Sequence, residues 1–232
     1  MRPEQQSSSP DNLPAAVLWD MDGTLVDTEP FWIRAEHELV ASHGGVWTDE
    51  MGHQLVGRAL EDSAQLIIDG TGIDLTVLEV VTHLLDRVIE QVEDRVPWRP
   101  GAPELLAELG DHGVPNVLVT MSWRNLAAAV LGNLPEGSFG GLVTGDEVTH
   151  GKPHPEPYLK AARSLGLQPE HCIAIEDSPT GVRSATAAGV PTIAVPHIVP
   201  VPEIPGSVQV SSLEGLRAAD LRLLVSEVWS LR

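Results

Sequence analysis

One stretch constrains the fold more than any other: the apolar run Val17-Leu18-Trp19, which ends in Asp20-Met21-Asp22-Gly23-Thr24. A short apolar run of this kind is typical of a buried strand in a parallel sheet. Asp20 then lies at the carboxyl end of that strand, the edge at which open α/β sheets bind ligands. Two neighbouring carboxylates there repel each other and lose hydration unless a cation joins them. The alternative is that these residues only form the turn after a strand.

The chain beyond residue 97 alternates between short apolar segments and helical patterns. The predicted strands are 16–20, 116–120, 142–144, 172–176 and 191–195, with a further short strand at 208–210. One or two helices are expected within 213–228. Such alternation predicts an α/β fold with a parallel sheet and helices on both faces.

Residues 30–96 follow a different pattern, with apolar residues at helical spacing and no convincing strand. This block sits between the first strand and the turn-rich segment 96–101. We therefore expect an all-helical cap at 30–96, inserted into a core of 14–29 and 97–232, after a disordered tail at 1–13. Because the insertion follows the first strand, the cap should hang over the carboxyl edge of the sheet as a lid.

Composition restricts the partners. The chain has 33 acidic and 14 basic residues, a formal net charge of −19, which disfavours nucleic acid and anionic membranes. An anionic substrate then needs a local positive source such as a metal ion or a lysine. Cys172 is the single cysteine, so no intrachain disulfide framework can form. No apolar stretch approaches the ~20 residues of a membrane span. We expect a cytoplasmic monomer with no nucleic-acid or membrane partner.

Several polar residues fall at the ends of predicted strands or just before a helix. Because the carboxyl ends of parallel strands share one edge of the sheet, these side chains should converge although they are far apart in sequence. They are Asp20, Asp22, Thr120, Lys152, Glu176 and Asp177.

The convergence predicts phosphoryl chemistry. Carboxylates such as Asp20 and Asp177 suit Mg²⁺, and the second oxygen of Asp20 is free to attack phosphorus. Asp22 can protonate the leaving oxygen and then deprotonate the attacking water. The Thr120 hydroxyl can donate to a phosphoryl oxygen, helped by the backbone amides that follow it, beginning at Met121.

Lys152 would place a positive charge beside the phosphate and the first aspartate. Taken singly, each of these residues has a simpler interpretation. Lys152 alone fits a surface loop and Thr120 alone fits a capping position, while Glu176 and Asp177 fit a strand-end turn in which Asp177 or Ser178 caps the next helix.

Four segments resemble, in order, the four motifs of the haloacid dehalogenase superfamily. The match spans about residues 15–200, and its segments are Asp20 to Thr28, Thr120, Gly151 to Pro155, and Ile175 to Gly181. The chain resembles the subfamily with a helical cap after the first strand, which includes sugar-phosphate phosphatases, phosphoglycolate phosphatases and β-phosphoglucomutases.

The resemblance implies a Rossmann-like core, an aspartyl-phosphate on Asp20 and Asp22 as the acid/base. It also implies Mg²⁺ held by Asp20, the Asp22 backbone carbonyl and Asp177, with Glu176 acting nearby through water. The substrate would be a small phosphorylated metabolite.

Two branches of the superfamily fit less well. Dehalogenases lack the second aspartate, so Asp22 argues against them. β-Phosphoglucomutases carry a histidine where Trp32 stands and an arginine where Leu60 stands. Arg58 lies two positions from Leu60, about 200° round a helix, and would face elsewhere. Hydrolysis is therefore the favoured interpretation; a mutase or phosphotransferase, and an idle binding domain of the same fold, remain the alternatives.

The segment 27–32 is similar to the corresponding one in bacterial hexitol- and 2-deoxyglucose-phosphate phosphatases. That local resemblance points to sugar or polyol phosphates. Candidate substrate contacts are Trp32, Arg58 and Arg124, together with Trp47. For the tryptophans, packing in the core is the favoured alternative.

Overall fold

A computed structural model of the chain describes residues 13–229, so the predicted disordered tail lies, apart from Leu13, outside the described residues. The core is a parallel sheet in the order β3-β2-β1-β4-β5-β6. Its strands are β1 (Ala16–Trp19), β2 (Asn116–Val119), β3 (Gly141–Val143), β4 (Cys172–Glu176), β5 (Thr192–Ala194) and β6 (Ser207–Gln209). The strand order changes direction between β1 and β4, which is where sheets of this kind form a ligand crevice.

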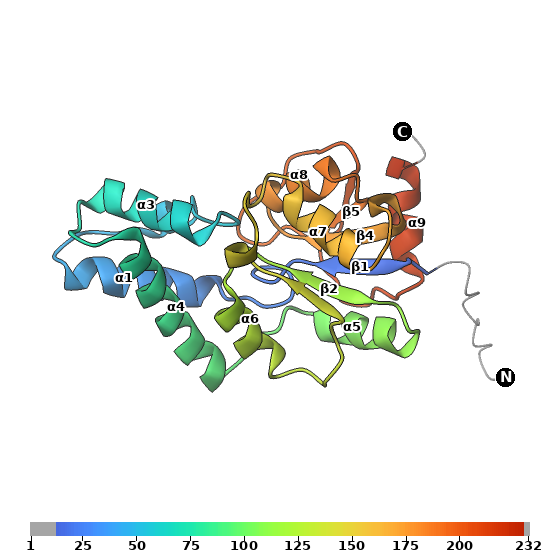
Figure 1. Cartoon of the computed structure of the whole chain (residues 1–232), viewed down its shortest axis with the longest axis horizontal. Helices are drawn as coiled ribbons and strands as arrows, with labels where there is room; N and C mark the ends of the chain where they lie inside the picture. Colours follow the sequence, from blue (N-terminus) through green and yellow to red (C-terminus); the bar gives the residue numbers. More distant parts are fainter. Residues whose placement is uncertain (1–12, 230–232) are drawn as a thin grey trace.

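Helices cover both faces of the sheet (Figure 1). Val17 and Trp19 of β1 pack with α5 (Ala102–Asp111), α6 (Arg124–Leu131) and α9 (Asp220–Trp229). Ala16 and Leu18 point to the other face, against α7 (Glu156–Ser164) and α8 (Pro179–Ala187). Because successive strand residues face opposite sides, burial on both sides requires the continuous apolar run seen in the sequence. A single helix, α9, forms within the terminal segment, where one or two were predicted.

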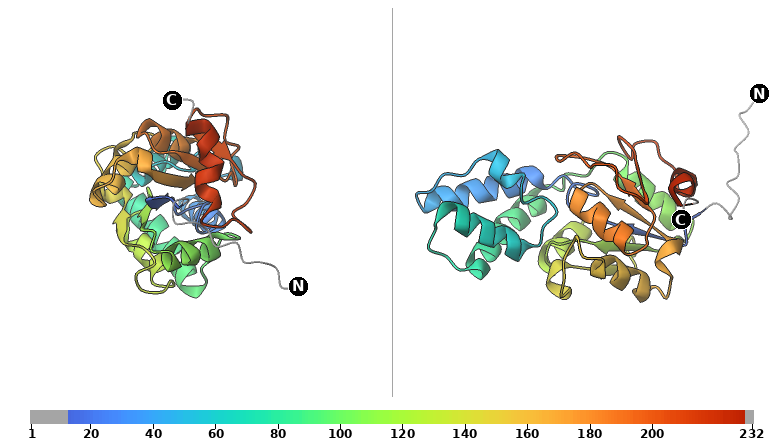
Figure 2. Two further views of the ribbon diagram at one scale, coloured as in Figure 1. Left: turned by 90° about the vertical axis from the view of Figure 1, so that its right-hand side faces the viewer. Right: turned by 90° about the horizontal axis from the view of Figure 1, so that it is seen from above.

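The insertion after β1 folds into four helices: α1 (Glu29–Ser42), the short α2 (Asp49–Gly52), α3 (Leu60–Thr71) and α4 (Val77–Asp94). They form a separate lobe beyond the carboxyl ends of the strands (Figures 1 and 2). Helix α4 begins with a capping box between Thr76 and Glu79 and buries one apolar face, on which α1 and α3 pack. The prediction of an inserted helical cap is confirmed; the short α2 was not foreseen.

The two chain segments that join cap and core run side by side. The Asp27 amide donates to the Pro97 carbonyl at 2.7 Å, and the Arg99 amide donates to the Leu25 carbonyl at 3.0 Å. This short pairing holds the start of the cap directly above the turn that follows β1. Among the described helices, none combines the length and apolar character needed to cross a membrane.

Candidate active site

The predicted residues meet at the carboxyl edge of the sheet, under the cap. Together with cap residues they line a cavity of about 700 Å³, part of which is open to solvent. The core residues on its wall are Asp20, Asp22, Thr120, Met121, Ser122, Lys152, Asp177 and Ser178. Glu176 is fully buried behind this wall.

Lys152 is the central cation of the site. Its ammonium donates to Asp20 Oδ1 at 2.6 Å, to Glu176 Oε1 at 2.6 Å and to the Val119 carbonyl at 2.9 Å. Burial by itself lowers the pKa of this ammonium, but the carboxylates of Asp20 and Glu176 raise that pKa above its usual value. Lys152 is therefore a buried, permanently charged residue, and the interpretation as a surface-loop lysine is wrong.

Both carboxylate oxygens of Glu176 accept hydrogen bonds. Besides Lys152, its carboxylate accepts from the Tyr158 hydroxyl at 2.9 Å, the Asp177 amide at 3.1 Å, and the amide and hydroxyl of Ser178, both at 3.2 Å. Both oxygens are thus already bonded, so Glu176 acts as an anchor that positions Lys152. Sequence reasoning missed Tyr158, whose partner lies 18 residues away in the chain.

Asp20 is different because only one of its oxygens is bonded. Its Oδ2 is buried and accepts no hydrogen bond from residues 13–229. Burial, together with repulsion from Glu176, raises the pKa of Asp20 to about 7, although Lys152 opposes the shift. The pKa of Asp177 is also raised well above its usual range, by burial and by the charge of Asp20. One lysine cannot offset this many buried acids.

A hard divalent cation fits this arrangement. Ligand oxygens of Asp20, Glu176 and Asp177 all lie within 4.8 Å of one another, and no donor in the described chain reaches the Asp177 carboxylate. Gly23, with φ of +90°, lets the turn approach so closely that a Cβ there would lie 2.1 Å from Asp177 Oδ2. The same turn leaves the Asp22 carbonyl oxygen without a donor from any described residue. Oxygen-only ligands of this kind suit Mg²⁺.

Asp177 does not cap the following helix. The cap of α8 is Ser178, whose hydroxyl accepts from the Gly181 amide at 3.0 Å. The N-cap alternative, which named Asp177 and Ser178, therefore holds for Ser178 but not for Asp177, whose carboxylate is left for the cavity.

Four donors surround the Asp22 carboxylate. Oδ2 accepts from Ser122 Oγ at 2.8 Å and from Thr120 Oγ1 at 3.2 Å. Oδ1 accepts from the Thr28 hydroxyl and, at 3.4 Å, from Trp32 Nε1. This ring of donors from both core and cap fixes the carboxylate at the cavity wall. Ser122 and Thr28 were not predicted, because nothing in their spacing distinguishes them from ordinary turn residues.

The start of the loop after β2 offers a further donor. The Ser122 amide donates to Thr120 Oγ1 at 3.0 Å, whereas the Met121 amide has no acceptor among the described residues. Gly145 allows this loop to pack closely, since a Cβ there would lie 2.1 Å from the Met121 carbonyl oxygen. The predicted Thr120–Met121 pair is thus placed beside Asp22.

The predicted cap contacts divide into two groups. Trp32 and Arg58 line the cavity. The expectation that Arg58 faces elsewhere is wrong, because Arg58 precedes α3, which begins at Leu60, and the rotation of a helix does not apply to it. Arg124 does not; its guanidinium is exposed and pairs with Glu147, so the structure does not bring it to the site. Trp47 is buried in the cap and donates to Glu36 Oε2 at 2.8 Å, as the core-packing alternative proposed.

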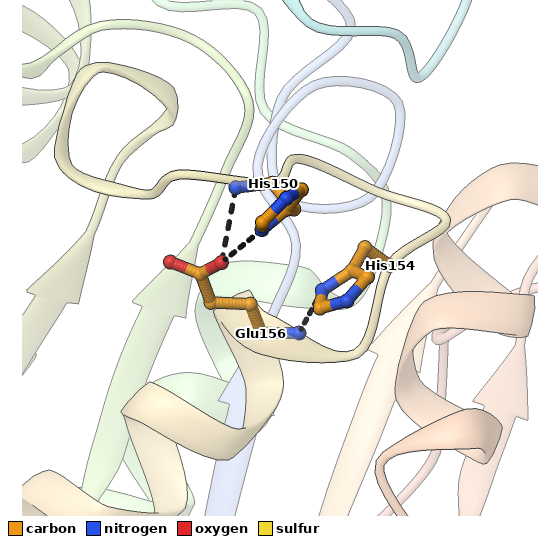
Figure 3. A group of neighbouring side chains, drawn as sticks. All are labelled: His150, His154 and Glu156. Carbon is orange, nitrogen blue, oxygen red and sulfur yellow. Dashed lines mark hydrogen bonds and ion pairs between the residues drawn. The ribbon is translucent and has the colours of Figure 1, made fainter.

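A second group of titratable side chains flanks Lys152 in the sequence: His150, His154 and Glu156 (Figure 3). Glu156 Oε1 accepts from the Thr149 amide at 2.8 Å, and Oε2 accepts from the His150 amide at 3.0 Å. The Glu156 amide donates to His154 Nδ1 at 3.2 Å. These hydrogen bonds join the loop on both sides of Lys152 to the first residue of α7. The cluster therefore stabilises the segment that carries Lys152.

The parallel sheet, the carboxylates at its switch point and the inserted helical cap together place the chain in the class of capped α/β enzymes with an acidic active site. A family model described as "Haloacid dehalogenase-like hydrolase" matches residues 17–195, and the chain belongs to this family.

Relatives and solved structures agree with this assignment. Hexitol phosphatase B of Escherichia coli is 34% identical over 225 residues, covering 89% of this chain and 96% of that protein. CbbY from Rhodobacter sphaeroides in complex with xylulose-(1,5)bisphosphate has a TM-score of 0.80 at 25% identity, covering 88% of this chain and 96% of the other. A β-phosphoglucomutase from Clostridium difficile, with a TM-score of 0.82 at 20% identity, covers 95% and 100% and shows the shared fold alone. The chain is an enzyme of the phosphoric monoester hydrolase class.

Proposed function

We propose that the protein is a Mg²⁺-dependent phosphatase of a small phosphorylated metabolite, a sugar or polyol phosphate, working through an aspartyl-phosphate on Asp20. One observation carries the proposal: Lys152 binds Oδ1 of Asp20, a residue of the cavity wall, while Oδ2 is buried with no donor among the described residues. A carboxylate held by one oxygen and bare at the other is oriented for nucleophilic attack.

The reaction has two halves. In the first, Asp20 Oδ2 forms a bond to phosphorus while the ester P–O bond breaks, and the leaving oxygen takes a proton from Asp22. In the second, Asp22 accepts a proton from water as the water oxygen bonds to phosphorus. The bond between Asp20 and phosphorus then breaks, which releases inorganic phosphate and restores the free carboxylate.

The other residues orient the reacting groups and offset the negative charge of the phosphoryl group. Asp20, Asp177 and the Asp22 carbonyl would hold Mg²⁺, which when bound supplies positive charge against the phosphoryl oxygens. Glu176, already bonded through both oxygens, positions Lys152. The Met121 amide lies on the same wall and would donate to the phosphoryl group, as would the Thr120 hydroxyl once it turns away from Asp22.

The size of the substrate follows from the cap. The reacting carboxylates lie inside a cavity that the cap helices cover, so a small phosphate ester fits and a folded protein surface does not. The relatives named hexitol phosphatase and, at 30% identity, fructose-1-phosphate phosphatase support a sugar or polyol phosphate.

The test is phosphate release from a panel of phosphorylated metabolites with and without Mg²⁺, using wild type, Asp20→Asn and the exposed control Asp69→Asn. We expect Asp20→Asn to lower kcat by at least about 1,000-fold and Asp69→Asn to match wild type. Near-wild-type activity of Asp20→Asn, once contaminating phosphatase is removed, contradicts the mechanism.

Product analysis separates the alternatives. With a sugar 1-phosphate, free phosphate supports the hydrolase, whereas an isomerised sugar phosphate supports a mutase or phosphotransferase. A protein inert toward p-nitrophenyl phosphate in Mg²⁺ would support the idle-domain alternative.

A further inference from the structure

Two histidines and a glutamate gather at the surface of the loop that carries Lys152 (Figure 3). His150 and His154 are exposed, and Glu156, the first residue of α7, is half-buried. One nitrogen of each ring and one carboxylate oxygen all lie within 4.8 Å of one another, and the ring centroids are 4.6 Å apart. The reaction proposed at Asp20 uses none of these three side chains.

The spacing of these atoms fits a chelated cation. His150 Nδ1 lies 3.1 Å from Glu156 Oε2. Zn²⁺ binds imidazole nitrogen and carboxylate oxygen at about 2.0–2.2 Å, so two such ligands at a tetrahedral angle stand roughly 3.4 Å apart. An ion can therefore bind between His150 and Glu156 with little movement of either side chain. The exposed His154 ring has to approach by no more than about 1.5 Å to become the third ligand.

Hydrogen bonds already bring the two rings close to the form that binds a metal. The Glu156 amide donates to His154 Nδ1 at 3.2 Å, so this nitrogen carries the lone pair that a metal needs. Because a carboxylate only accepts, the bond to Glu156 places a proton on His150 Nδ1. An ion at that nitrogen requires the other neutral tautomer, whose proton sits on Nε2, and the exposed ring can keep that proton hydrated.

The backbone limits the freedom of the ligands before any ion binds. Pro153 and Pro155 flank His154, and a proline ring fixes its own φ at about −65°. The Ser184 hydroxyl donates to the His154 carbonyl at 2.6 Å, which ties the loop to α8. The Glu156 carboxylate is held by the backbone amides described above. Binding therefore orders few additional groups, which lowers the entropic cost of forming a site.

The ligand types decide which ion fits. Two imidazoles and one carboxylate suit borderline divalent ions such as Zn²⁺ and Ni²⁺, whereas Mg²⁺ prefers oxygen ligands alone. The cluster thus differs chemically from the oxygen-only site at Asp20 and Asp177, so the two places would select different ions.

Negative charge from the cap adds to the attraction for a cation. Glu61 and Asp62, at the start of α3, are exposed and line the same groove as the two histidines. Cap and loop touch here, since a Cβ at Gly151 would lie 3.5 Å from the Ala59 Cβ. Lys152 also reaches this groove, but two carboxylates offset its charge. A cation at the histidines therefore lies in a mainly negative field.

We propose that His150, His154 and Glu156 form a second metal site, for Zn²⁺, which rigidifies the loop that carries Lys152. The three protein ligands leave a coordination position for water. The ion would join the residues before and after Lys152, so its binding free energy adds to the stability of this segment in the folded chain. The site goes beyond the proposed phosphatase function and does not depend on it.

Calorimetric titration of the tag-free protein with Zn²⁺, in excess Mg²⁺ to fill the acidic site, tests for this binding. We expect wild type to bind one Zn²⁺ per chain, and His154→Ala and Glu156→Gln each to bind it at least about 10-fold more weakly. His171→Ala is the matched control, because His171 is exposed and lies outside the cluster, and it should match wild type. Equal Kd values in wild type, His154→Ala and Glu156→Gln would overturn the site.

A further variant separates this site from the acidic one. Asp177→Asn removes a carboxylate next to Asp20 and should leave the Kd for Zn²⁺ unchanged. A Kd that rises in Asp177→Asn but not in His154→Ala would place the ion among the acids under the cap and overturn the second site. The readout is binding, so absence of phosphatase turnover would count against the proposed function alone.

Hydrogen exchange shows whether the ion acts on the loop. The amides of Thr149 and His150, both bonded to Glu156, should exchange about 10-fold more slowly at a Zn²⁺ concentration ten times Kd. The same slowing is expected in His171→Ala and none in His154→Ala, with Glu156→Gln as the second variant should His154→Ala fold poorly. Zn²⁺ binding that leaves these amides unchanged would overturn the stabilising role of the ion.

Discussion

Lys152 Nζ lies 2.6 Å from Asp20 Oδ1, while the buried Asp20 Oδ2 has no donor in the described part of the chain. The two residues are 132 positions apart, and their contact gives the two chemically equivalent oxygens of one carboxylate different surroundings. One oxygen is held by a charge-assisted hydrogen bond, and the other accepts from none of the described residues.

Removing the Lys152 charge should destabilise the protein. In Lys152→Met, Asp20 and Glu176 lose their shared partner while both stay buried, and breaking a buried ion pair costs about 3–5 kcal/mol. Urea unfolding in EDTA measures the loss, with the exposed Lys160→Met as control. A Lys152→Met protein as stable as Lys160→Met would show that the pair contributes no net stability.

Asp22→Asn should separate the two halves of the reaction. p-Nitrophenolate leaves without a proton, so the first half can still proceed, whereas the second half lacks its base. Rapid mixing with p-nitrophenyl phosphate should show a burst of about one equivalent of p-nitrophenolate, followed by slow turnover. With an alkyl phosphate, no such burst of alcohol is expected. Slow single-phase release of p-nitrophenolate would argue against Asp22 as the base of the second half.

Gly23→Ala should weaken metal binding. Its Cβ would lie 2.1 Å from Asp177 Oδ2, at a φ of +90°, so the proposed metal ligand must move. Gly44→Ala is a matched control, because Gly44 also has positive φ, +76°, but a Cβ there meets nothing within 4 Å. Both variants carry backbone strain of about 1–2 kcal/mol. The Mg²⁺ concentration for half-maximal activity should rise at least about 10-fold in Gly23→Ala alone, and a similar rise in Gly44→Ala would assign the effect to strain.

Glu36→Gln should make the stability less dependent on pH. The folded-state pKa of Glu36 is raised from 4.5 to about 7, so wild type loses stability as the pH rises from about 4.5 to 7, where the unfolded chain ionises first. Glutamine cannot ionise. The variant should equal wild type near pH 4.5 and exceed it by about 2–3 kcal/mol above pH 8. Urea unfolding of both proteins across this pH range measures the difference in stability, with Glu38→Gln as control. A difference between wild type and Glu36→Gln that does not change with pH would contradict a raised pKa of Glu36.

Much of the core could be predicted because parallel sheets impose simple rules. Strands buried on both faces need continuous apolar runs, and their carboxyl ends share an edge. Asp20, Thr120 and Asp177 could therefore be placed together without knowing a single distance. The inserted helical cap followed in the same way, from helical spacing between one strand and the next.

The cap interior could not be predicted in this way. Glu36 and Glu38 are both acidic residues of one amphipathic helix, yet Glu36 is 4% exposed and faces the cavity while Glu38 is exposed. The difference depends on how α1 is rotated against α4, which helical periodicity constrains only to within part of a turn. Arg124 shows the converse: it follows a site loop in sequence, but Glu147 holds it outside the cavity.

The Asp20-Met21-Asp22 stretch illustrates which features the sequence determines and which ones depend on the tertiary structure. By itself, the sequence determined that two carboxylates end a buried strand, because apolar runs and turn residues act over a few positions along the chain. Only the tertiary structure decided that Lys152 takes one oxygen of Asp20, that four donors surround Asp22 and that Glu176 is a fully bonded anchor. Those outcomes depend on hydrogen bonds between residues up to 132 positions apart in the chain. The lengths of such bonds vary by only about 0.5 Å, and no local sequence pattern encodes contacts of that accuracy.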